Sequence, residues 1–209
     1  MDKVIKHVLS GNCIVYPTTT QPALGCMLNS EGLDKLYKIK QRDSSFPLSI
    51  GVANIEQAKT IVEVPDDVLD ILSYFPDGSL TIILKSHKKL DSRLGGNKIA
   101  IRIMAHKKAK ELLLKTGPLT ATSANKSGVA PVLNCKAAAS ILSSSENKVV
   151  SYMGECSDGI PSTLISWHTV CESLELSDIV ILREGIVKSK DVLRWWKNQI
   201  SNSGETLVT

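Results

Sequence analysis

The stretch PLTATSANKSG, Pro118 to Gly128, places an apolar segment directly before a run of small polar residues. The segment 119–122 is predicted to be a buried strand, and the polar residues after it can form hydrogen bonds but cannot fill a core. Two structures are compatible with this pattern: an ordinary turn, or the floor of a pocket that holds a polar ligand. Small side chains leave backbone N–H groups accessible, as the binding of phosphate requires. The surrounding sequence has to decide between the two.

The composition describes a globular protein with a weakly basic charge. Of 209 residues, 43% are hydrophobic and 22% are charged, which excludes wholesale disorder. The net charge of +4 suits an anionic ligand but is too small to indicate a nucleic-acid-binding protein by itself. The five cysteines are an odd number without metal-ligand spacing, so we expect reduced thiols, a cytoplasmic protein and no metal site. No apolar run approaches the roughly 20 residues that a membrane span needs.

Helical and strand patterns alternate irregularly, so we expect a single α/β domain around a mixed, twisted, largely open sheet. The domain is expected to span residues 1–200, and the end of the chain, 201–209, to be a flexible tail. The expected helices are 2–9, 31–41 with Ser30 as N-cap, 55–61, 66–75, 107–115, 135–142 and 191–200. The expected strands are 13–16, 47–53, 80–84, 99–103, 119–122, 149–152, 162–166 and 179–182. The segment PTTTQPALG, residues 17–25, is expected to be a loop.

Two segments besides the opening one carry side chains suited to a polar ligand. Lys40 continues the apolar stripe of helix 31–41, so it either extends to solvent at an ordinary helix end or points into a cleft, and Arg42 follows it. The pattern alone slightly favours the solvated helix end. Thr18 to Thr20 form a row of hydroxyls at the end of a strand, where α/β sheets tend to bind ligands, although such a row also satisfies the backbone of an ordinary turn.

Two arginines lie within apolar segments near predicted strands. Arg102 follows KIAI, and Arg183 lies in ILREG; charged residues beside core segments need partners. Several cations and many hydroxyls at strand and helix ends suggest one pocket for a polyanion. Neither GxxxxGK[ST] nor GxGxxG occurs in the chain, so the pocket is not a common phosphate-binding loop.

Five motifs in this order resemble the YrdC-like family of L-threonylcarbamoyladenylate synthases: PTxT, KxR, a strand-terminal SAN, PST and LRxG. The resemblance covers about residues 14–185 and is to the short form, without an extra C-terminal domain. It implies a twisted, open α/β sheet with a basic concave groove. It also implies a nucleotidyltransferase that converts L-threonine, bicarbonate and ATP to threonylcarbamoyl-AMP and pyrophosphate, with Mg²⁺ carried by ATP. The product serves the modification of adenosine 37 in tRNA, which implies possible contact with RNA and downstream threonylcarbamoyl-transfer proteins.

The resemblance also assigns roles to individual residues. The implied catalytic residues are Lys40 and Arg42. The residues implied to bind ATP are Lys40, Arg42, Ser123, Asn125 and Arg183. Those implied to bind threonine are Thr20, Arg102 and Ser162.

Several positions depart from the family pattern. The family usually reads PT[DE]TxYGLG, whereas this chain has Thr19 and Pro22 in place of the acid and the aromatic residue. Phe46 replaces a polar residue before Pro47, Gly51 aligns with a family histidine, and PDGS replaces the usual PGP. These differences are compatible with a divergent member, with altered substrate handling or with reduced activity.

Two other functions are compatible with parts of the pattern. A non-catalytic RNA-binding module would use the basic groove, but basic and aromatic residues are not interleaved. A hydrolase with a Ser123 nucleophile and Lys40 base would need a lysine of lowered pKa beside an exposed serine. Neither explains the PTxT and LRxG segments, so the synthase is the favoured hypothesis.

Overall fold

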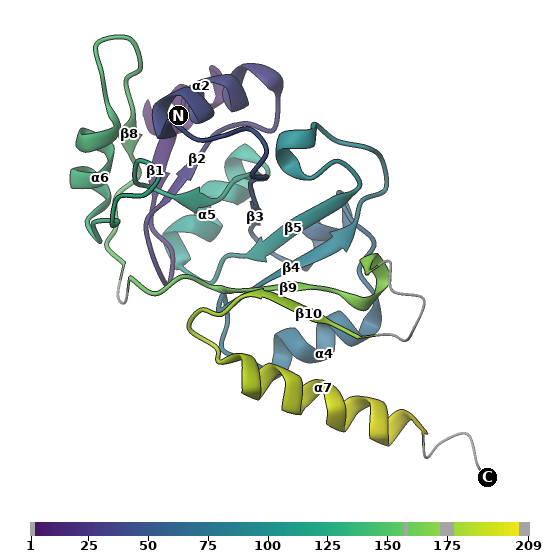
Figure 1. Cartoon of the computed structure of the whole chain (residues 1–209). Coiled ribbons are helices and arrows are strands. Elements are labelled where there is room, and N and C mark those ends of the chain that lie inside the picture. The colour runs from purple at the N-terminus through teal and green to yellow at the C-terminus, as the bar shows by residue number, and fades with distance from the viewer. Residues whose placement is uncertain (1–2, 157–158, 172–177, 205–209) are drawn as a thin grey trace.

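The computed structural model describes residues 3–156, 159–171 and 178–204 (Figure 1). Helices and strands alternate along these residues, as the sequence pattern predicts. The α-helices are α1 (Lys3–Leu9), α2 (Ser30–Lys40), α3 (Ile55–Lys59), α4 (Asp66–Tyr74), α5 (Lys107–Thr116), α6 (Cys135–Leu142) and α7 (Ser189–Gly204). Short 3-10 helices span Ser92–Leu94 and His168–Val170.

The strands form two mixed sheets rather than one continuous sheet. The smaller sheet has the order β7-β2-β1-β8, with β7 (Thr122–Ser123), β2 (Ala23–Gly25), β1 (Ile14–Tyr16) and β8 (Val150–Ser151). The larger sheet has the order β10-β9-β4-β5-β3-β6, with β10 (Val180–Arg183), β9 (Thr163–Ser166), β4 (Leu80–Lys85), β5 (Lys98–Ile103), β3 (Ile50–Val52) and β6 (Leu119–Thr120). Both sheets combine parallel and antiparallel pairs, which confirms a mixed α/β fold.

The chain passes from one sheet to the other inside the stretch that opens the sequence. The expected strand 119–122 is divided at Ala121: β6 pairs with β3 in the larger sheet, and β7 pairs with β2 in the smaller one. Ser49 holds the crossing point, because its carbonyl accepts from the Ala121 amide (2.7 Å) and its hydroxyl donates to the Ala121 carbonyl (2.6 Å). The polar residues after β6 therefore lie at the junction of the sheets.

Two local expectations are wrong. Residues 23–25 form β2 and not a loop, because they pair antiparallel with β1 and are buried on both faces, a tertiary effect that a three-residue segment does not reveal. Gly25 allows this pairing, since a Cβ there would lie 2.6 Å from the Tyr16 ring. The N-cap of α2 is Asn29 and not Ser30: the Asn29 side chain accepts from the Gly32 amide at 2.9 Å.

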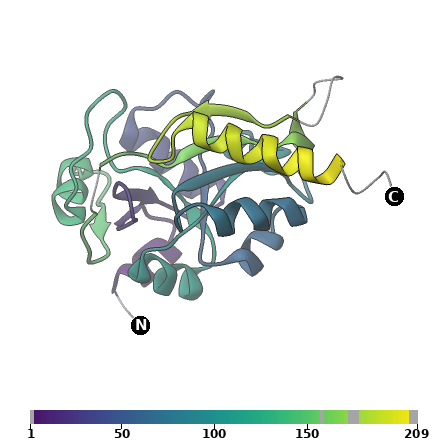
Figure 2. The same ribbon diagram turned by 90° about the horizontal axis from the view of Figure 1, so that it is seen from below.

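The C-terminal helix is longer than the sequence pattern predicts. It begins at Ser189 and continues to Gly204, so 201–204 belong to α7, whereas 205–209 lie outside the described residues. Helices α7 and α4 lie side by side in both views (Figures 1 and 2), and the rings of Tyr74 and Trp195 are 6.2 Å apart. Within the described part of the chain, no helix has the length and apolar character to cross a bilayer.

Candidate functional site

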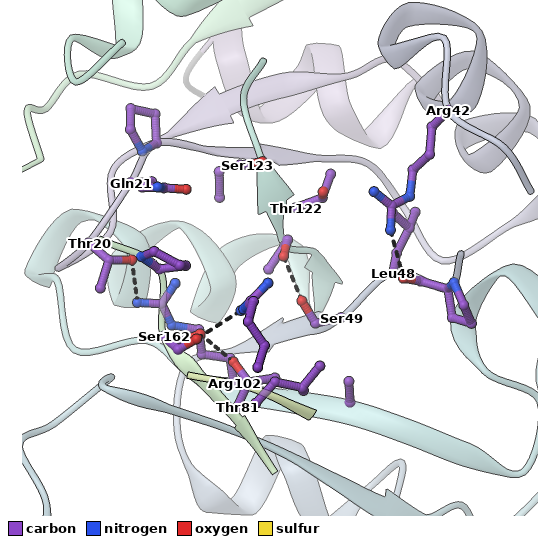
Figure 3. A pocket seen from close by; sticks show the side chains of 18 residues that line it. Thr20, Gln21, Arg42, Leu48, Ser49, Thr81, Arg102, Thr122, Ser123 and Ser162 are labelled. Atoms are coloured by element: carbon purple, nitrogen blue, oxygen red, sulfur yellow. Dashed lines mark hydrogen bonds between the residues drawn. The ribbon is translucent and has the colours of Figure 1, made fainter. Parts of the chain in front are cut away.

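A pocket of about 220 Å³ lies where the two sheets meet (Figure 3). The smaller sheet contributes β2 and β7, and the larger one contributes β4, β5, β9 and β10. The wall carries three arginines, Arg42, Arg102 and Arg183, and none of its 18 lining residues is acidic. A wall of this charge favours an anionic ligand, because each guanidinium presents several donors to phosphate or carboxylate oxygens.

Arg102 is the most firmly held of these arginines. Its side chain is buried, with 8% exposed, and its Nε and Nη2 donate to the Gly78 carbonyl at 3.0 and 2.8 Å. Nη2 also donates to the Thr20 hydroxyl at 2.8 Å. Burial lowers the pKa of Arg102 to about 10, so the guanidinium stays charged at neutral pH. Gly78 has a φ of +74°, a backbone conformation that suits glycine in the turn before β4.

The PTTT segment forms a turn and also contributes to the pocket wall. Thr18 satisfies the turn, because its hydroxyl donates to the Gln21 carbonyl at 2.7 Å and accepts from the Thr20 amide at 3.1 Å. Thr20 lines the pocket, where its hydroxyl lies 3.1 Å from that of Thr18 and accepts from Arg102. The turn therefore directs one threonine hydroxyl at the arginine in the pocket wall.

Ser162 and Arg183 form a further part of the wall. The Ser162 hydroxyl lies 2.7 Å from the Thr81 hydroxyl, and the Ser162 carbonyl accepts from Arg183 Nη2 at 2.8 Å (Figure 3). Gly185 of the LREG segment makes this approach possible, since a Cβ there would lie 2.2 Å from the Pro161 carbonyl oxygen. The glycine of this motif is therefore required by the close approach of two backbone segments.

Lys40 lies beneath the pocket and does not line it. Its side chain is only 1% exposed, and its ammonium donates to the carbonyls of Ser123 and, at 2.7 Å, Asn125. The solvated helix end, slightly favoured by the pattern alone, is therefore wrong for Lys40. Burial, with a smaller contribution from the charge of Arg42, lowers the pKa of Lys40 to about 8.

Arg42 takes a different direction and lines the pocket. The chain turns sharply between the two residues, because Gln41 has a left-handed conformation with a φ of 51°. Arg42 Nε donates to the Phe46 carbonyl at 3.1 Å, and its guanidinium lies 5.7 Å from the centre of the Phe46 ring. Phe46 is 60% exposed, so this contact between the ring and the arginine lies at the surface.

The SAN segment divides between the pocket wall and the loop below it. Ser123 lines the pocket, whereas Asn125 does not. The Asn125 amide donates to the carbonyls of Lys126, at 3.0 Å, and Val129, at 2.5 Å, and thereby holds the loop together. Its Oδ1 is buried and has no hydrogen-bond partner among the described residues.

Six of the eight predicted site residues line the pocket: Thr20, Arg42, Arg102, Ser123, Ser162 and Arg183. Sequence reasoning missed Ser49 and Thr81, which add two hydroxyls to the wall. Thr81 is the polar residue in the otherwise apolar run LTIIL, a signal that could have indicated it. Ser49 carries no local signal, because its position depends on the crossing at Ala121.

The described residues give no sign of a protein-held metal or of a disulfide. Among them, no group of three or more His, Cys, Asp or Glu side chains could hold a metal ion. All five cysteines belong to this part of the chain and are free thiols, and four of them are buried. The lining of the pocket offers guanidinium groups, hydroxyls and the side-chain amide of Gln21.

Comparisons with known proteins find relatives along most of the chain. The family model Sua5/YciO/YrdC, described as "Telomere recombination", matches residues 6–185. A protein of Methanocaldococcus jannaschii named "Putative threonylcarbamoyl-AMP synthase" is 31% identical over 194 residues, which cover 90% of this chain and 87% of that protein. A threonylcarbamoyl-AMP synthase of Pseudomonas aeruginosa is 34% identical over 125 residues, covering 58% of this chain and 68% of that protein.

Solved structures show the same fold. Sua5 of P. abyssi, crystallised with L-threonine, has a TM-score of 0.76 at 24% identity, covering 91% of this chain and 55% of that one. YciO of E. coli has a TM-score of 0.71 at 23% identity, covering 89% of each chain.

Proposed function

Because the chain belongs to the Sua5/YciO/YrdC family, we propose that its pocket makes threonylcarbamoyl-AMP. The chain is a nucleotidyltransferase that converts L-threonine, bicarbonate and ATP to threonylcarbamoyl-AMP and pyrophosphate. The observation that carries this function is the acid-free pocket with three arginines at the junction of the sheets. Such a pocket suits ATP, bicarbonate and threonine, because each of them is an anion or carries a carboxylate.

The reaction needs alignment and charge neutralisation more than a nucleophilic side chain. The amine of threonine and bicarbonate form a carbamate with loss of water. A carbamate oxygen then attacks the α-phosphorus of ATP, and pyrophosphate leaves with the electron pair of the broken P–O bond. Fixed cations around the phosphates lower the barrier because negative charge passes to the leaving pyrophosphate, and a cation at the threonine carboxylate aligns the carbamate for attack.

The pocket wall offers one group of residues for threonine and another for the phosphates of ATP. Arg102, Thr20 and Ser162 lie together and would bind the carboxylate and hydroxyl of threonine. Arg42 and Arg183 would bind the phosphates. Burial, with a smaller contribution from the charge of Arg42, lowers the pKa of Arg183. These assignments follow the geometry of the pocket and the family motifs.

Lys40, Ser123 and Asn125 would serve the nucleotide as one unit. Ser123 faces the pocket, and the Lys40 ammonium fixes the carbonyls on either side of Ala124. We therefore assign Lys40 a role through the position of this loop, which would line the nucleotide, and assign Asn125 a role in keeping the loop closed. The direct contact with phosphate falls to Arg42.

Mg²⁺ fits this pocket only when it is bound to the phosphates of ATP. The wall provides hydroxyls but no carboxylate, and Mg²⁺ commonly retains several waters when bound to phosphates. The residues present would orient the triphosphate and leave the ion to the phosphate oxygens and water. The adenylate would then pass to threonylcarbamoyl-transfer proteins that act on tRNA in the cytoplasm.

The non-catalytic RNA-binding alternative is less well supported. It requires cations on an open surface, whereas Arg102 is buried behind Thr20 and the three arginines converge on one small pocket. The hydrolase alternative fails on geometry, because Lys40 bonds to the Ser123 carbonyl and no bond from its ammonium to the Ser123 hydroxyl is present.

The function is tested by the release of pyrophosphate from ATP in the presence of bicarbonate, with and without L-threonine. We expect release that requires threonine and is lost when Arg102 is replaced by methionine, with Arg194→Met on the exposed face of α7 as the matched control. Release that is the same without threonine, or no release while ATP binds tightly, would contradict the synthase.

A further inference from the structure

A second pocket, also of about 220 Å³, lies behind the first one. Apolar side chains from α4, β4 and β5 and from the segments after α4 and β5 form most of its wall, among them Leu72, Phe75, Leu80, Ile103 and Met104. None of the residues that line the first pocket lines this one. The roles assigned above therefore leave the second pocket unexplained.

The two pockets lie on opposite faces of the larger sheet at the same end of β4 and β5. Successive side chains of a strand point to opposite faces. On β4, Leu80 lines the second pocket and Thr81 the first, and on β5 Ile103 lines the second and Arg102 the first. A single layer of backbone separates them.

Two opposite charges line the second pocket without pairing with each other. Asp77 lies in the turn before β4, and Lys110 lies on α5. Neither side chain forms a hydrogen bond or ion pair with the described residues; Asp77 is exposed and Lys110 is half-buried. An apolar pocket with one free anion and one free cation on its wall complements a ligand that carries both charges and an apolar body.

We propose that this second pocket binds a free α-amino acid with a branched aliphatic side chain such as that of leucine. Its ammonium group would pair with Asp77, its carboxylate with Lys110, and its side chain would pack against Leu72, Phe75 and Ile103. A simple carboxylic acid would place like charge beside Asp77, and a simple amine would place like charge beside Lys110. Both are therefore weaker ligands than the zwitterion.

The turn at Gly78 connects this pocket to the first one. Gly78 lines the second pocket, and its carbonyl accepts both bonds from Arg102 in the first. A ligand that shifts the turn would shift the guanidinium that we assign to threonine, and linkage requires each ligand to affect the other equally. This coupling rests on the proposed function, whereas the binding itself does not.

Calorimetric titration with L-leucine tests the binding. We expect leucine to bind with a dissociation constant of about 1 mM, and 4-methylpentanoate and 3-methylbutylamine, which each lack one charge, to bind about tenfold more weakly. Lys110→Met and Asp77→Asn should each weaken leucine binding to a similar degree. Lys115→Met, an exposed position on the same helix, should leave it unchanged, and thermal melts confirm that all variants fold.

Two results would overturn the proposal. One is the absence of leucine binding up to about 10 mM in wild-type protein that binds ATP. The other is leucine binding that threonine displaces completely and that Asp77→Asn leaves unchanged, because leucine would then occupy the first pocket. A change of about fivefold in threonine affinity at saturating leucine would support the coupling, and an unchanged affinity would refute it. Leucine binding by a protein that makes no adenylate would support the second pocket and contradict only the proposed function.

Discussion

Lys40 and Arg42 are two residues apart at the end of α2, yet they belong to different regions of the site. Lys40 is buried under the SAN loop, where its ammonium donates to two backbone carbonyls. Arg42 lies past the left-handed turn at Gln41 and faces the pocket with Arg102 and Arg183. The KxR spacing thus provides one cation that positions a loop and one that meets the ligand. We call the first region the loop anchor (Lys40 with 123–125) and the second the arginine wall.

Loss of the loop anchor is expected to have the largest effect. Lys40→Met keeps the length of the side chain but removes the donor from the carbonyls of Ser123 and Asn125. With the loop released, kcat for adenylate formation should fall at least about a hundredfold, or about 3 kcal/mol. Lys38→Met, on the exposed face of the same helix, is the control and should stay near wild type. Full activity of Lys40→Met would contradict the role of Lys40 in positioning the loop.

The buried charge of Lys40 predicts a pH dependence of stability. Its pKa of about 8 lies below its ordinary value of 10.5, so between these pH values the unfolded chain binds more protons than the folded one. The contribution of Lys40 to the free energy of unfolding should therefore increase as pH rises through this window, by about 3 kcal/mol in all. The measurement is the difference in unfolding free energy between wild type and Lys40→Met from pH 7 to 10.

Using the difference removes the titration of other groups, such as Tyr16, whose pKa burial raises. A difference that does not change with pH would mean that the carbonyl bonds keep the ammonium charged despite its burial.

Within the arginine wall, Arg102→Lys should produce an intermediate effect. The charge remains, but a lysine cannot bond to Gly78 and Thr20 with the fixed fork of a guanidinium. We expect KM for threonine to rise about tenfold to a hundredfold, while KM for ATP changes little. Steady-state kinetics with each substrate varied separately measure the two KM values independently. An equal change in both constants would contradict the division of the wall into a threonine end and a phosphate end.

The smallest effect is expected at the edge of the wall. Phe46→Ala removes the ring beside Arg42, an exposed cation–π contact worth about 0.5–1 kcal/mol. KM for ATP should rise about two- to fivefold. Tyr74→Ala, an exposed aromatic residue on α4, is the control and should have no effect. An increase in ATP affinity would show that Phe46 holds Arg42 away from the ligand instead of positioning it for binding.

Most of the elements could be predicted from the sequence because they depend on local patterns, whereas six residues of the pocket wall are predicted from the family motifs. Apolar periodicity gives helices such as α5 and α6, and the position of Arg102 after KIAI indicates a charge at a sheet face. The motif glycine Gly185 also has a structural reason in the close approach to Pro161. The helices and the charge at Arg102 need only the neighbouring residues of the chain, whereas the reason for Gly185 lies in a distant segment.

Features that depend on distant segments could not be predicted. The break at Ala121 requires Ser49 from another strand, and β2 exists only because β1 and β7 lie on either side of it. The stripe of α2 indicates that Lys40 continues a buried face, but its partners are more than 80 residues away in the sequence. The second pocket likewise joins a turn before β4 to a helix after β5.

The most direct test of the central claim follows radiolabelled bicarbonate into product, with L-threonine, ATP and Mg²⁺ present. If the arginine wall aligns the carbamate of threonine with the α-phosphate, label will appear in an adenylate only when both threonine and ATP are supplied. Arg102→Lys will reduce that label, and added threonine will restore much of it. Wild-type protein that binds ATP and threonine but transfers no label to an adenylate would contradict the account.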